Sequence, residues 1–121
     1  MLNNIILVVD DEANIRETIA FILEMEGYDV ILAENGEEAL RKIKEFKPKF
    51  VILDVMMPKK NGYEVAREIR KYEEFKKMYI LILTAKGQSV DERDAIEAGA
   101  DSYMSKPFDD EKILRLIEEN F

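Results

Sequence analysis

Five short apolar runs recur along the chain, and a stretch with helical spacing separates each run from the next. The first four are unbroken rather than alternating, are rich in β-branched residues, and cover residues 5–9, 28–32, 50–53 and 79–83. The fifth, residues 101–104, is shorter and less apolar. Unbroken apolar character is typical of strands that are covered on both faces. The runs therefore predict five β-strands in a buried sheet.

The stretches between the runs predict helices. Ile15, Ile19, Ile22 and Leu23 follow the spacing i, i+4, i+7 and i+8, which is one face of a helix that ends near Gly27. Similar spacing predicts four more helices. The second contains Ala39, Leu40, Ile43 and Phe46 and ends before Pro48, and the third contains Val65, Ala66 and Ile69. The fourth runs from Val90 to Ala98 before Gly99, and the fifth contains Ile113, Leu114 and Ile117 and begins near Asp109 or Asp110.

Strand and helix thus alternate about five times, which predicts one domain over residues 1–121. Parallel strands joined by helices need right-handed crossovers. The predicted fold class is therefore α/β: a doubly wound, five-stranded parallel sheet with helices on both faces. In such sheets ligands bind at the carboxyl ends of the strands, beside the point where the strand order reverses.

Composition narrows the chemistry available at that edge. The chain has no Cys and no His, which excludes disulfides, thiolate nucleophiles, imidazole bases and nitrogen or sulfur metal ligands. Its formal net charge of −8 disfavours nucleic acid and anionic lipid as direct partners. No stretch approaches the roughly 18 apolar residues of a membrane span, and the N-terminus lacks the basic region of a signal peptide. We therefore expect a cytoplasmic protein that binds neither nucleic acid nor membrane.

Three acidic residues stand at the carboxyl ends of predicted strands. Asp10 and Asp11 follow the first run, and Asp54 follows the third. A single acid there is most simply a helix cap or a solvated loop residue. Three converging acids need another explanation, because two unit charges about 4 Å apart repel by roughly 4 kcal/mol at an effective dielectric constant of about 20. A divalent cation with oxygen ligands, Mg²⁺ or Mn²⁺, would relieve this repulsion and keep positions for phosphate oxygens.

Two more polar residues are expected at the same edge. Thr84 ends the fourth run, and Lys106 follows the fifth. Alone, each is an ordinary strand or surface residue. Beside a carboxylate and a divalent cation, their hydroxyl and ammonium groups complete the parts needed for phosphoryl transfer by positioning and charge neutralisation.

These residues lie in motifs that resemble the receiver domain of bacterial response regulators of the single-domain chemotaxis and sporulation type. The resemblance covers essentially the whole chain. It implies a flavodoxin-like sheet and a signalling switch in a two-component phosphorelay, which acts as an enzyme only in its own phosphorylation and dephosphorylation. The motifs, in order, are Val8-Val9-Asp10-Asp11-Glu12, Leu53-Asp54 with Met57-Pro58 and Gly62, Leu83-Thr84-Ala85, and Gly99-Ala100-Asp101 through Lys106-Pro107-Phe108.

The resemblance also implies the roles of the acidic residues and the lysine. Asp54 would accept a phosphoryl group from a phosphohistidine on a sensor histidine kinase or a phosphotransfer protein. Asp11, Asp54 and the main-chain carbonyl of Met56 would bind Mg²⁺ (Mn²⁺ is the other candidate), and Asp10 would act mainly through a water ligand. Lys106 would pair with the phosphoryl group.

Partner surfaces and the switch follow from the same resemblance. Thr84 and Tyr103 would change conformation together on phosphorylation and alter the surface seen by an unknown downstream effector. Phe21 lies off the apolar stripe of its helix, which indicates a kinase-docking face. The residues expected in that face are Asn14, Thr18, Phe21, Pro107 and Phe108.

The chain is expected to be a monomer. The dimer of the DNA-binding receiver subfamily is held by charge pairs, and the matching positions here, Ser102, Lys112 and Leu116, lose or reverse those charges.

Other classes of function predict different residues. A small-molecule phosphohydrolase that uses an aspartyl phosphate and Mg²⁺ usually has a second acid two residues after the nucleophile, where this chain has Met56. A flavodoxin-like cofactor binder would need a phosphate-cradling loop after the first strand, where Asp10 and Asp11 would repel phosphate. A pseudo-receiver would lack Asp54, Lys106 or the acidic pair, all of which are present.

Overall fold

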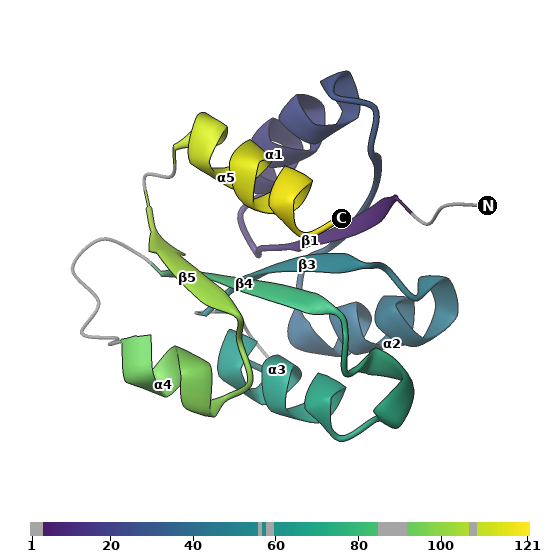
Figure 1. Cartoon of the computed structure of the whole chain (residues 1–121), viewed down its shortest axis with the longest axis vertical. Coiled ribbons are helices and arrows are strands. Elements are labelled where there is room, and N and C mark those ends of the chain that lie inside the picture. Colours follow the sequence, from purple (N-terminus) through teal and green to yellow (C-terminus); the bar gives the residue numbers. More distant parts are fainter. Residues whose placement is uncertain (1–3, 56, 58–59, 85–91, 107–108) are drawn as a thin grey trace.

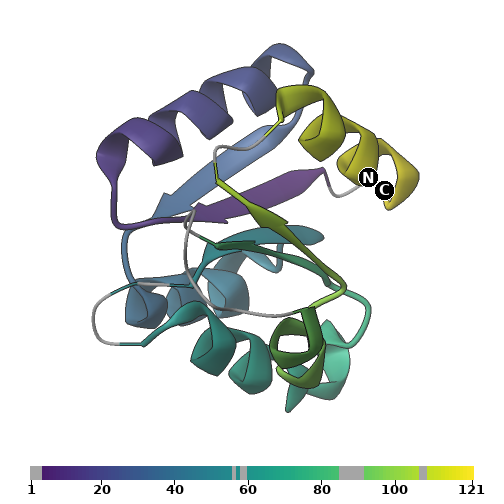
Figure 2. The same ribbon diagram turned by 90° about the vertical axis from the view of Figure 1, so that its left-hand side faces the viewer.

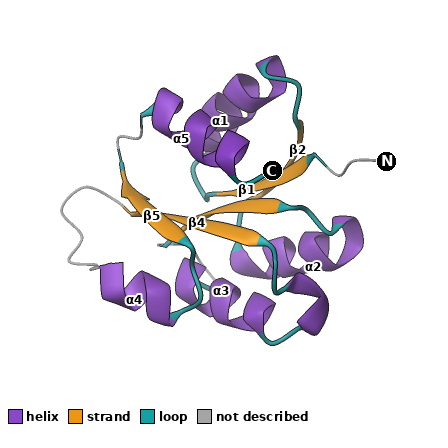
Figure 3. Cartoon of the chain, viewed as in Figure 1, coloured by secondary structure: helices purple, strands orange, loops and turns teal. Residues whose placement is uncertain are grey.

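A sheet of five parallel strands forms the centre of the structure, a computed structural model that describes residues 4–55, 57, 60–84, 92–106 and 109–121 (Figure 1). Strand and helix alternate along the chain, as Figure 3 shows by colour, which confirms the predicted α/β fold class. The strands are β1 (Ile5–Val9), β2 (Asp29–Ala33), β3 (Phe50–Asp54), β4 (Tyr79–Thr84) and β5 (Ser102–Ser105). The helices are α1 (Ala13–Met25), α2 (Gly36–Phe46), α3 (Gly62–Arg70), α4 (Glu92–Glu97) and α5 (Asp110–Glu119), with a short 3-10 helix η1 (Glu73–Phe75).

The strand order is β2-β1-β3-β4-β5, so the order reverses between β1 and β3. Val9 lies opposite Leu53, and Asp54 lies opposite Leu83. The carboxyl ends of β1, β3 and β4 therefore lie side by side at one edge of the sheet, where the predicted site residues stand.

Helices cover both faces of the sheet. Figure 2 shows α1 and α5 on one face and α2, α3 and α4 on the other. Successive residues of a strand point to opposite faces: Leu7 and Val9 join the cluster beneath α2, α3 and α4, whereas Ile6 and Val8 join the cluster beneath α1 and α5. All five residues of β3 are buried, which explains why the central runs are unbroken.

The helix ends follow from local chemistry. The side chain of Asn35 accepts a hydrogen bond from the Glu38 N–H at the start of α2, and Asn61 forms a capping box with Glu64 at the start of α3. Asp109 caps α5, so the predicted start of that helix is confirmed.

Three predicted details differ from the structure. The second strand begins at Asp29 because the Tyr28 N–H donates to the Leu23 carbonyl at the end of α1. The fifth strand runs from Ser102 to Ser105, since the Asp101 carboxylate instead accepts from the Ile80 N–H. The sequence predicts Phe46 on the apolar face of its helix. In the structure it is the last residue of α2 and its side chain is exposed. Val90, the predicted start of the fourth helix, lies outside the described residues.

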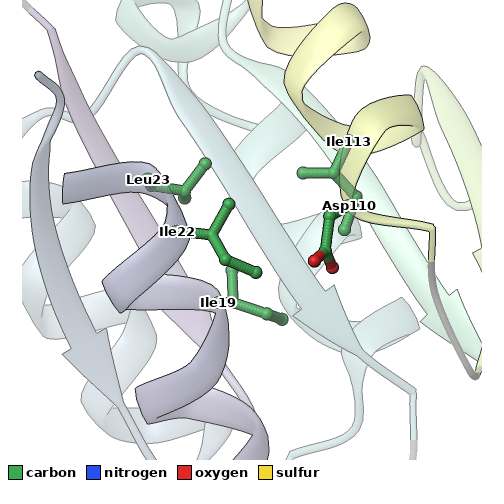
Figure 4. Close-up of a pocket in the computed structure, with 5 residues that line it drawn as sticks. All are labelled: Ile19, Ile22, Leu23, Asp110 and Ile113. Carbon is green, nitrogen blue, oxygen red and sulfur yellow. The ribbon is translucent and has the colours of Figure 1, made fainter. Parts of the chain in front are cut away.

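Helices α1 and α5 pack side by side on one face of the sheet. Figure 4 shows Ile19, Ile22 and Leu23 of α1 facing Asp110 and Ile113 of α5 across a shallow pocket. Four of these five side chains are apolar, so the pocket is a packing seam rather than a place for polar chemistry. None of the described helices is long and apolar enough to cross a bilayer.

Gly62 lets α3 begin directly against the end of β3. A Cβ atom placed on Gly62 would lie 2.5 Å from the main-chain oxygen of Asp54. The Gly62 N–H donates to the Val55 carbonyl at 3.0 Å, which ties the helix start to the residue after Asp54. Any larger residue at position 62 must push α3 away from the end of β3.

We expect Gly62→Ala to lower the free energy of unfolding by about 1–3 kcal/mol, because the added methyl group overpacks a backbone contact that has no flexible partner. Urea denaturation of the two proteins measures this. Arg67→Ala, at an exposed position of the same helix, is the control and should change stability by less than about 0.5 kcal/mol. A Gly62→Ala protein as stable as wild type would contradict the close approach.

Candidate functional site

Buried polar side chains are rare in this structure, and they meet at one place. Among the described residues, three polar or charged side chains are buried: Asp10, Asp54 and Thr84. They stand at the carboxyl ends of β1, β3 and β4. The strand order reverses beside them, between β1 and β3. Sheets of this type bind ligands at that point.

Lys106 joins two of these residues across a large separation in sequence. Its Nζ donates a hydrogen bond to Asp10 Oδ2 at 2.9 Å and another to Asp54 Oδ1 at 3.2 Å. The Lys106 N–H donates to the Thr84 carbonyl at 2.7 Å, which fixes the lysine at the end of β5 beside β4. One ammonium group therefore holds together two carboxylates that would otherwise repel each other.

The surroundings change the acidity of both partners. Burial, followed by the nearby Asp10 carboxylate, raises the pKa of Asp54 to about 6, although Lys106 acts in the opposite direction. Burial would lower the pKa of Lys106, but its hydrogen bonds and ion pairs with Asp10 and Asp54 outweigh burial and raise that pKa above its ordinary value. Lys106 is therefore a cation throughout the neutral range, and Asp54 is ionised above about pH 6.

Two neighbours that sequence reasoning did not single out hold Asp10 in place. The Glu12 N–H donates to Asp10 Oδ1 at 2.9 Å. Arg16 Nη1 donates to the main-chain oxygen of Asp10 at 2.7 Å. Arg16 lies in the first turn of α1, so its long side chain can reach back to the end of β1. A basic residue at this position was the one signal in the sequence that could have predicted the contact.

An acidic cluster lies beside this lysine bridge. The carboxylate oxygens of Asp10, Asp11 and Glu12 approach within 4.8 Å of one another, and Asp11 and Glu12 are exposed. A donor set made only of oxygen fits a hard divalent cation such as Mg²⁺. Glu12 was part of the predicted motif but was not predicted as a ligand, whereas Asp10 and Asp11 were. Met56, whose main-chain carbonyl was predicted as a ligand, lies outside the described residues.

The remaining predicted residues lie around this edge. Tyr103, in β5, is 37% exposed. Phe21 is 66% exposed on α1 and shares its face with Asn14 and Thr18, both exposed. Pro107 and Phe108 lie outside the described residues. The structure thus gathers Asp10, Asp54, Thr84 and Lys106 and leaves Tyr103 and Phe21 at the surface.

Comparison with known families identifies this arrangement. Residues 6–118 match the family described as the response regulator receiver domain. This chain belongs to that family. Receiver domains bind Mg²⁺ at an acidic pocket and interact with histidine kinases, and they act as signalling switches in two-component systems.

Individual relatives agree with this assignment. The chain is 49% identical to the alkaline phosphatase synthesis transcriptional regulatory protein PhoP of Bacillus subtilis over 108 residues, which are 88% of this chain and 44% of that protein. The receiver is also similar to the solved structure of the chemotaxis response regulator CheY4 of Vibrio cholerae, with a TM-score of 0.90 and 30% identity over 99% of this chain and 100% of that one. A response regulator receiver domain from Clostridium thermocellum gives a TM-score of 0.87 and 35% identity over 98% and 94% of the two chains.

The chain spans about half the length of the curated relatives that it matches. Those relatives are described as transcriptional regulatory proteins. The part that this chain shares with them is the receiver domain.

The raised pKa of Asp54 predicts how pH changes the stability of the metal-free receiver. Because the folded pKa of about 6 exceeds the ordinary aspartate pKa of 3.8, the folded state holds this proton more tightly than the unfolded state does. The contribution of Asp54 to stability is therefore largest below about pH 4 and is lost as the pH rises through 6. Asp54→Asn removes the titrating group, so it should stabilise the fold more at about pH 7.5 than at pH 4, by on the order of 2 kcal/mol.

Denaturation of both proteins in the presence of a chelator, at the two pH values, measures this difference. Glu119→Gln, at an exposed position at the end of α5, is a control for the removal of one carboxylate outside the Lys106 bridge. A stability difference between Asp54→Asn and wild type that does not change with pH would show that the Asp54 pKa is not raised.

Proposed function

We propose that this receiver accepts a phosphoryl group on Asp54 from a phosphohistidine of a sensor histidine kinase or a phosphotransfer protein. The observation that supports this proposal is that the buried polar residues Asp10, Asp54 and Thr84 converge on Lys106 at one edge of the sheet. In the reaction an Asp54 carboxylate oxygen attacks phosphorus, a P–O bond forms, and the P–N bond to the histidine breaks. An ionised carboxylate needs no general base for this attack.

Residues of the acidic cluster would hold the metal ion. Asp10, Asp11, Asp54 and the main-chain carbonyl of Met56 are the proposed ligands of Mg²⁺, with Mn²⁺ as the alternative ion, and Glu12 lies close enough to contribute. When bound, the ion supplies positive charge against the phosphoryl oxygens. The chain would use this chemistry to catalyse its own phosphorylation and dephosphorylation, with no small-molecule substrate beyond the phosphodonor.

Lys106 supplies the second positive charge. In the structure its ammonium group is shared between Asp10 and Asp54. Once Asp54 carries a phosphoryl group, the same ammonium can donate to a phosphoryl oxygen with a short movement of a flexible side chain. The bridge therefore keeps the catalytic cation at the reacting carboxylate before the donor arrives.

Labelling with acetyl phosphate tests this assignment. We expect one phosphoryl group per chain, stable in acid and labile in base, that forms with Mg²⁺ or Mn²⁺ and is absent in excess chelator. Asp54→Ala should abolish labelling, and Lys106→Ala should slow it at least about tenfold because a charge-assisted contact to the transferred group is lost. Glu119→Ala, which removes an exposed carboxylate at the end of α5, is the control and should label normally.

The opposite results are equally clear. Labelling of Asp54→Ala at the wild-type rate, or full labelling in excess chelator, would overturn the assignment of Asp54 and the metal. A catalytic turnover of small phosphate esters would favour the phosphohydrolase alternative, which the labelling assay distinguishes by release of phosphate in excess over protein.

Phosphorylation would change the surface of the receiver through Thr84 and Tyr103. The phosphoryl group adds up to about two negative charges, and the buried Thr84 hydroxyl is near enough to the site, at the end of β4, to turn toward it. Tyr103 lies on the neighbouring strand and is partly exposed. We propose that movement of Thr84 opens space into which Tyr103 turns, and that a downstream effector binds this altered surface.

The exposed face of α1 is the proposed kinase-docking surface. Asn14, Thr18 and Phe21 lie on this face, and Met25, which is 72% exposed, extends it by one turn. The sequence prediction did not include Met25. Two large apolar side chains next to each other on an outer helix face indicate a binding patch more strongly than either one alone. Pro107 and Phe108 are proposed to continue the docking surface.

Replacement of Phe21 tests the docking surface. We expect Phe21→Ala to slow phosphoryl transfer from the cognate kinase at least about tenfold, because an apolar contact with the partner is lost. Labelling by acetyl phosphate should stay within about twofold of wild type, since that reaction needs no docking. Arg67→Ala, exposed on α3 across the sheet from α1, is the control. An equal loss in both reactions would indicate a folding defect and would remove Phe21 from the docking surface.

We also propose that the receiver works as a monomer in the cytoplasm and makes no direct contact with nucleic acid or membrane. The formal net charge of −8 supports the absence of a nucleic-acid partner. Lys112 of α5 lines a surface pocket together with Tyr103, and Arg115 is exposed on the same helix. Like charges that meet twice across a two-fold axis disfavour a symmetric dimer through this face.

A further inference from the structure

Two segments at the amino ends of β3 and β4, opposite the proposed phosphoryl site, are positively charged, whereas the rest of the chain is strongly negative. Residues 44–49 and 71–77 contain six Lys and three Glu, a net charge of +3, whereas the other residues of the chain hold −11. The first segment runs from the end of α2 to the start of β3, and the second contains η1 and leads to β4. Because β3 and β4 are neighbours, with Phe50 opposite Tyr79, the fold brings the two segments together.

A surface pocket of about 200 Å³ lies between the two segments. Its apolar lining is formed by Pro48, Phe75 and Met78, all of which are buried. Its polar lining is formed by exposed side chains: Lys47, Lys49, Lys77 and Glu74. The pocket thus combines an apolar floor with a rim that has three cations and one anion.

The rim is only partly neutralised by the protein itself. Lys47 Nζ lies 3.4 Å from Glu74 Oε2, which pairs the one rim carboxylate with one of the three lysines. Lys49 Nζ donates to the main-chain oxygen of Phe121 at 3.4 Å and lies 5.3 Å from the centre of the Phe121 ring. Lys77 makes no hydrogen bond or ion pair with the described part of the chain. Neither of these two ammonium groups is paired with a side-chain carboxylate of the described residues.

The backbone holds this rim in a fixed shape. Lys47 has φ 49 and is the one non-glycine residue with positive φ in the described part of the chain. Its N–H donates to the Ile43 carbonyl at 2.9 Å and closes α2, and the buried Pro48 follows. On the other side, Arg70 Nη1 donates to the main-chain oxygens of Phe75 and Met78 at 3.1 and 2.8 Å. A preformed rim costs less ordering on binding than a flexible one.

From these observations we propose that the pocket binds an acidic segment of a partner protein, with an apolar side chain of that segment on the floor and its carboxylates on Lys49 and Lys77. Charge complementarity selects an anionic partner. The apolar floor favours a peptide over nucleic acid, since a phosphate backbone would gain nothing from Pro48, Phe75 or Met78.

Binding at this pocket is independent of phosphorylation. Lys49 directly precedes β3 and Asp54 is the last residue of that strand, so the two lie about 16 Å apart at roughly 3.3 Å per residue. The pocket lies at the amino ends of the strands, and the proposed switch residues lie at or beside their carboxyl ends. A partner held here would leave Asp54 and the exposed face of α1 accessible.

The test uses a fluorescent peptide with a central Leu-Phe pair flanked on each side by three Glu, and a matched peptide with Gln in place of Glu. At about 0.15 M salt, where exposed charges more than about 8 Å apart are largely screened, the acidic peptide should bind and the Gln peptide should bind at least about tenfold more weakly. Amide NMR shifts should be largest in residues 47–49 and 74–78. The affinity should be the same, within about twofold, with Mg²⁺ and a phosphate analogue bound at Asp54.

Matched variants separate the pocket from general charge attraction. Lys49→Glu/Lys77→Glu should weaken binding of the acidic peptide at least about tenfold, with an unchanged thermal transition as evidence of folding. Arg41→Glu/Arg67→Glu makes the same change in net charge at exposed positions outside the pocket, on α2 and α3, and should change affinity less than about threefold.

Several results would overturn the proposal. These are no binding of the acidic peptide, equal weakening by both double variants, shifts centred on α1 or Tyr103, or an affinity that changes with the phosphate analogue. Sedimentation of the unmodified receiver alone gives a further outcome: self-association that Lys49→Glu/Lys77→Glu abolishes would show that a second copy of this chain occupies the pocket instead.

Discussion

The ion pairs of one lysine with two buried aspartates are the contacts on which the working edge of this receiver depends. Asp10 and Asp54 lie at the ends of neighbouring central strands, out of contact with water, where two carboxylates repel strongly. The Lys106 ammonium lies between them at 2.9 and 3.2 Å and offsets that repulsion. Burial, together with the Asp10 carboxylate, still raises the pKa of Asp54, so the charge of Lys106 does not fully offset the cost of ionising it. A site that remains short of positive charge attracts a divalent cation and can hold the oxygens of a phosphoryl group next to it.

The rest of the fold serves to keep these groups in register. Parallel pairing of β1, β3 and β4 places their ends together, and two helical layers bury the strands so that the ends cannot shift. Gly62 permits α3 to start against Asp54, and Arg16 returns from α1 to the backbone of Asp10. Stability and function therefore oppose each other locally: apolar packing on both faces supports a cluster of charges that is itself unfavourable for folding.

The two edges of the sheet have opposite electrostatic character. The carboxyl edge carries the acidic cluster and the opposite edge carries the lysine-rich rim. Because β3 runs from one edge to the other, a signal that changes the first edge and a partner bound at the second do not compete for the same residues. If the proposed surfaces are used, this separation would let a small receiver bind a kinase, an effector and a further partner at different places.

The sequence by itself determined the fold class, the positions of the five strands to within one residue and the identity of the charged residues, because unbroken apolar runs and helical spacing are local patterns. It placed Asp10, Asp54, Thr84 and Lys106 at one edge through the rule that parallel strands end together. Only the tertiary structure decided that Lys106 bridges two aspartates, that Glu12 joins the acidic cluster, that Met25 extends the face of Phe21, and that two lysine-rich segments enclose one pocket. Each of these depends on contacts between distant parts of the chain or on which face of an element is covered, and neither leaves a periodic signal in the sequence.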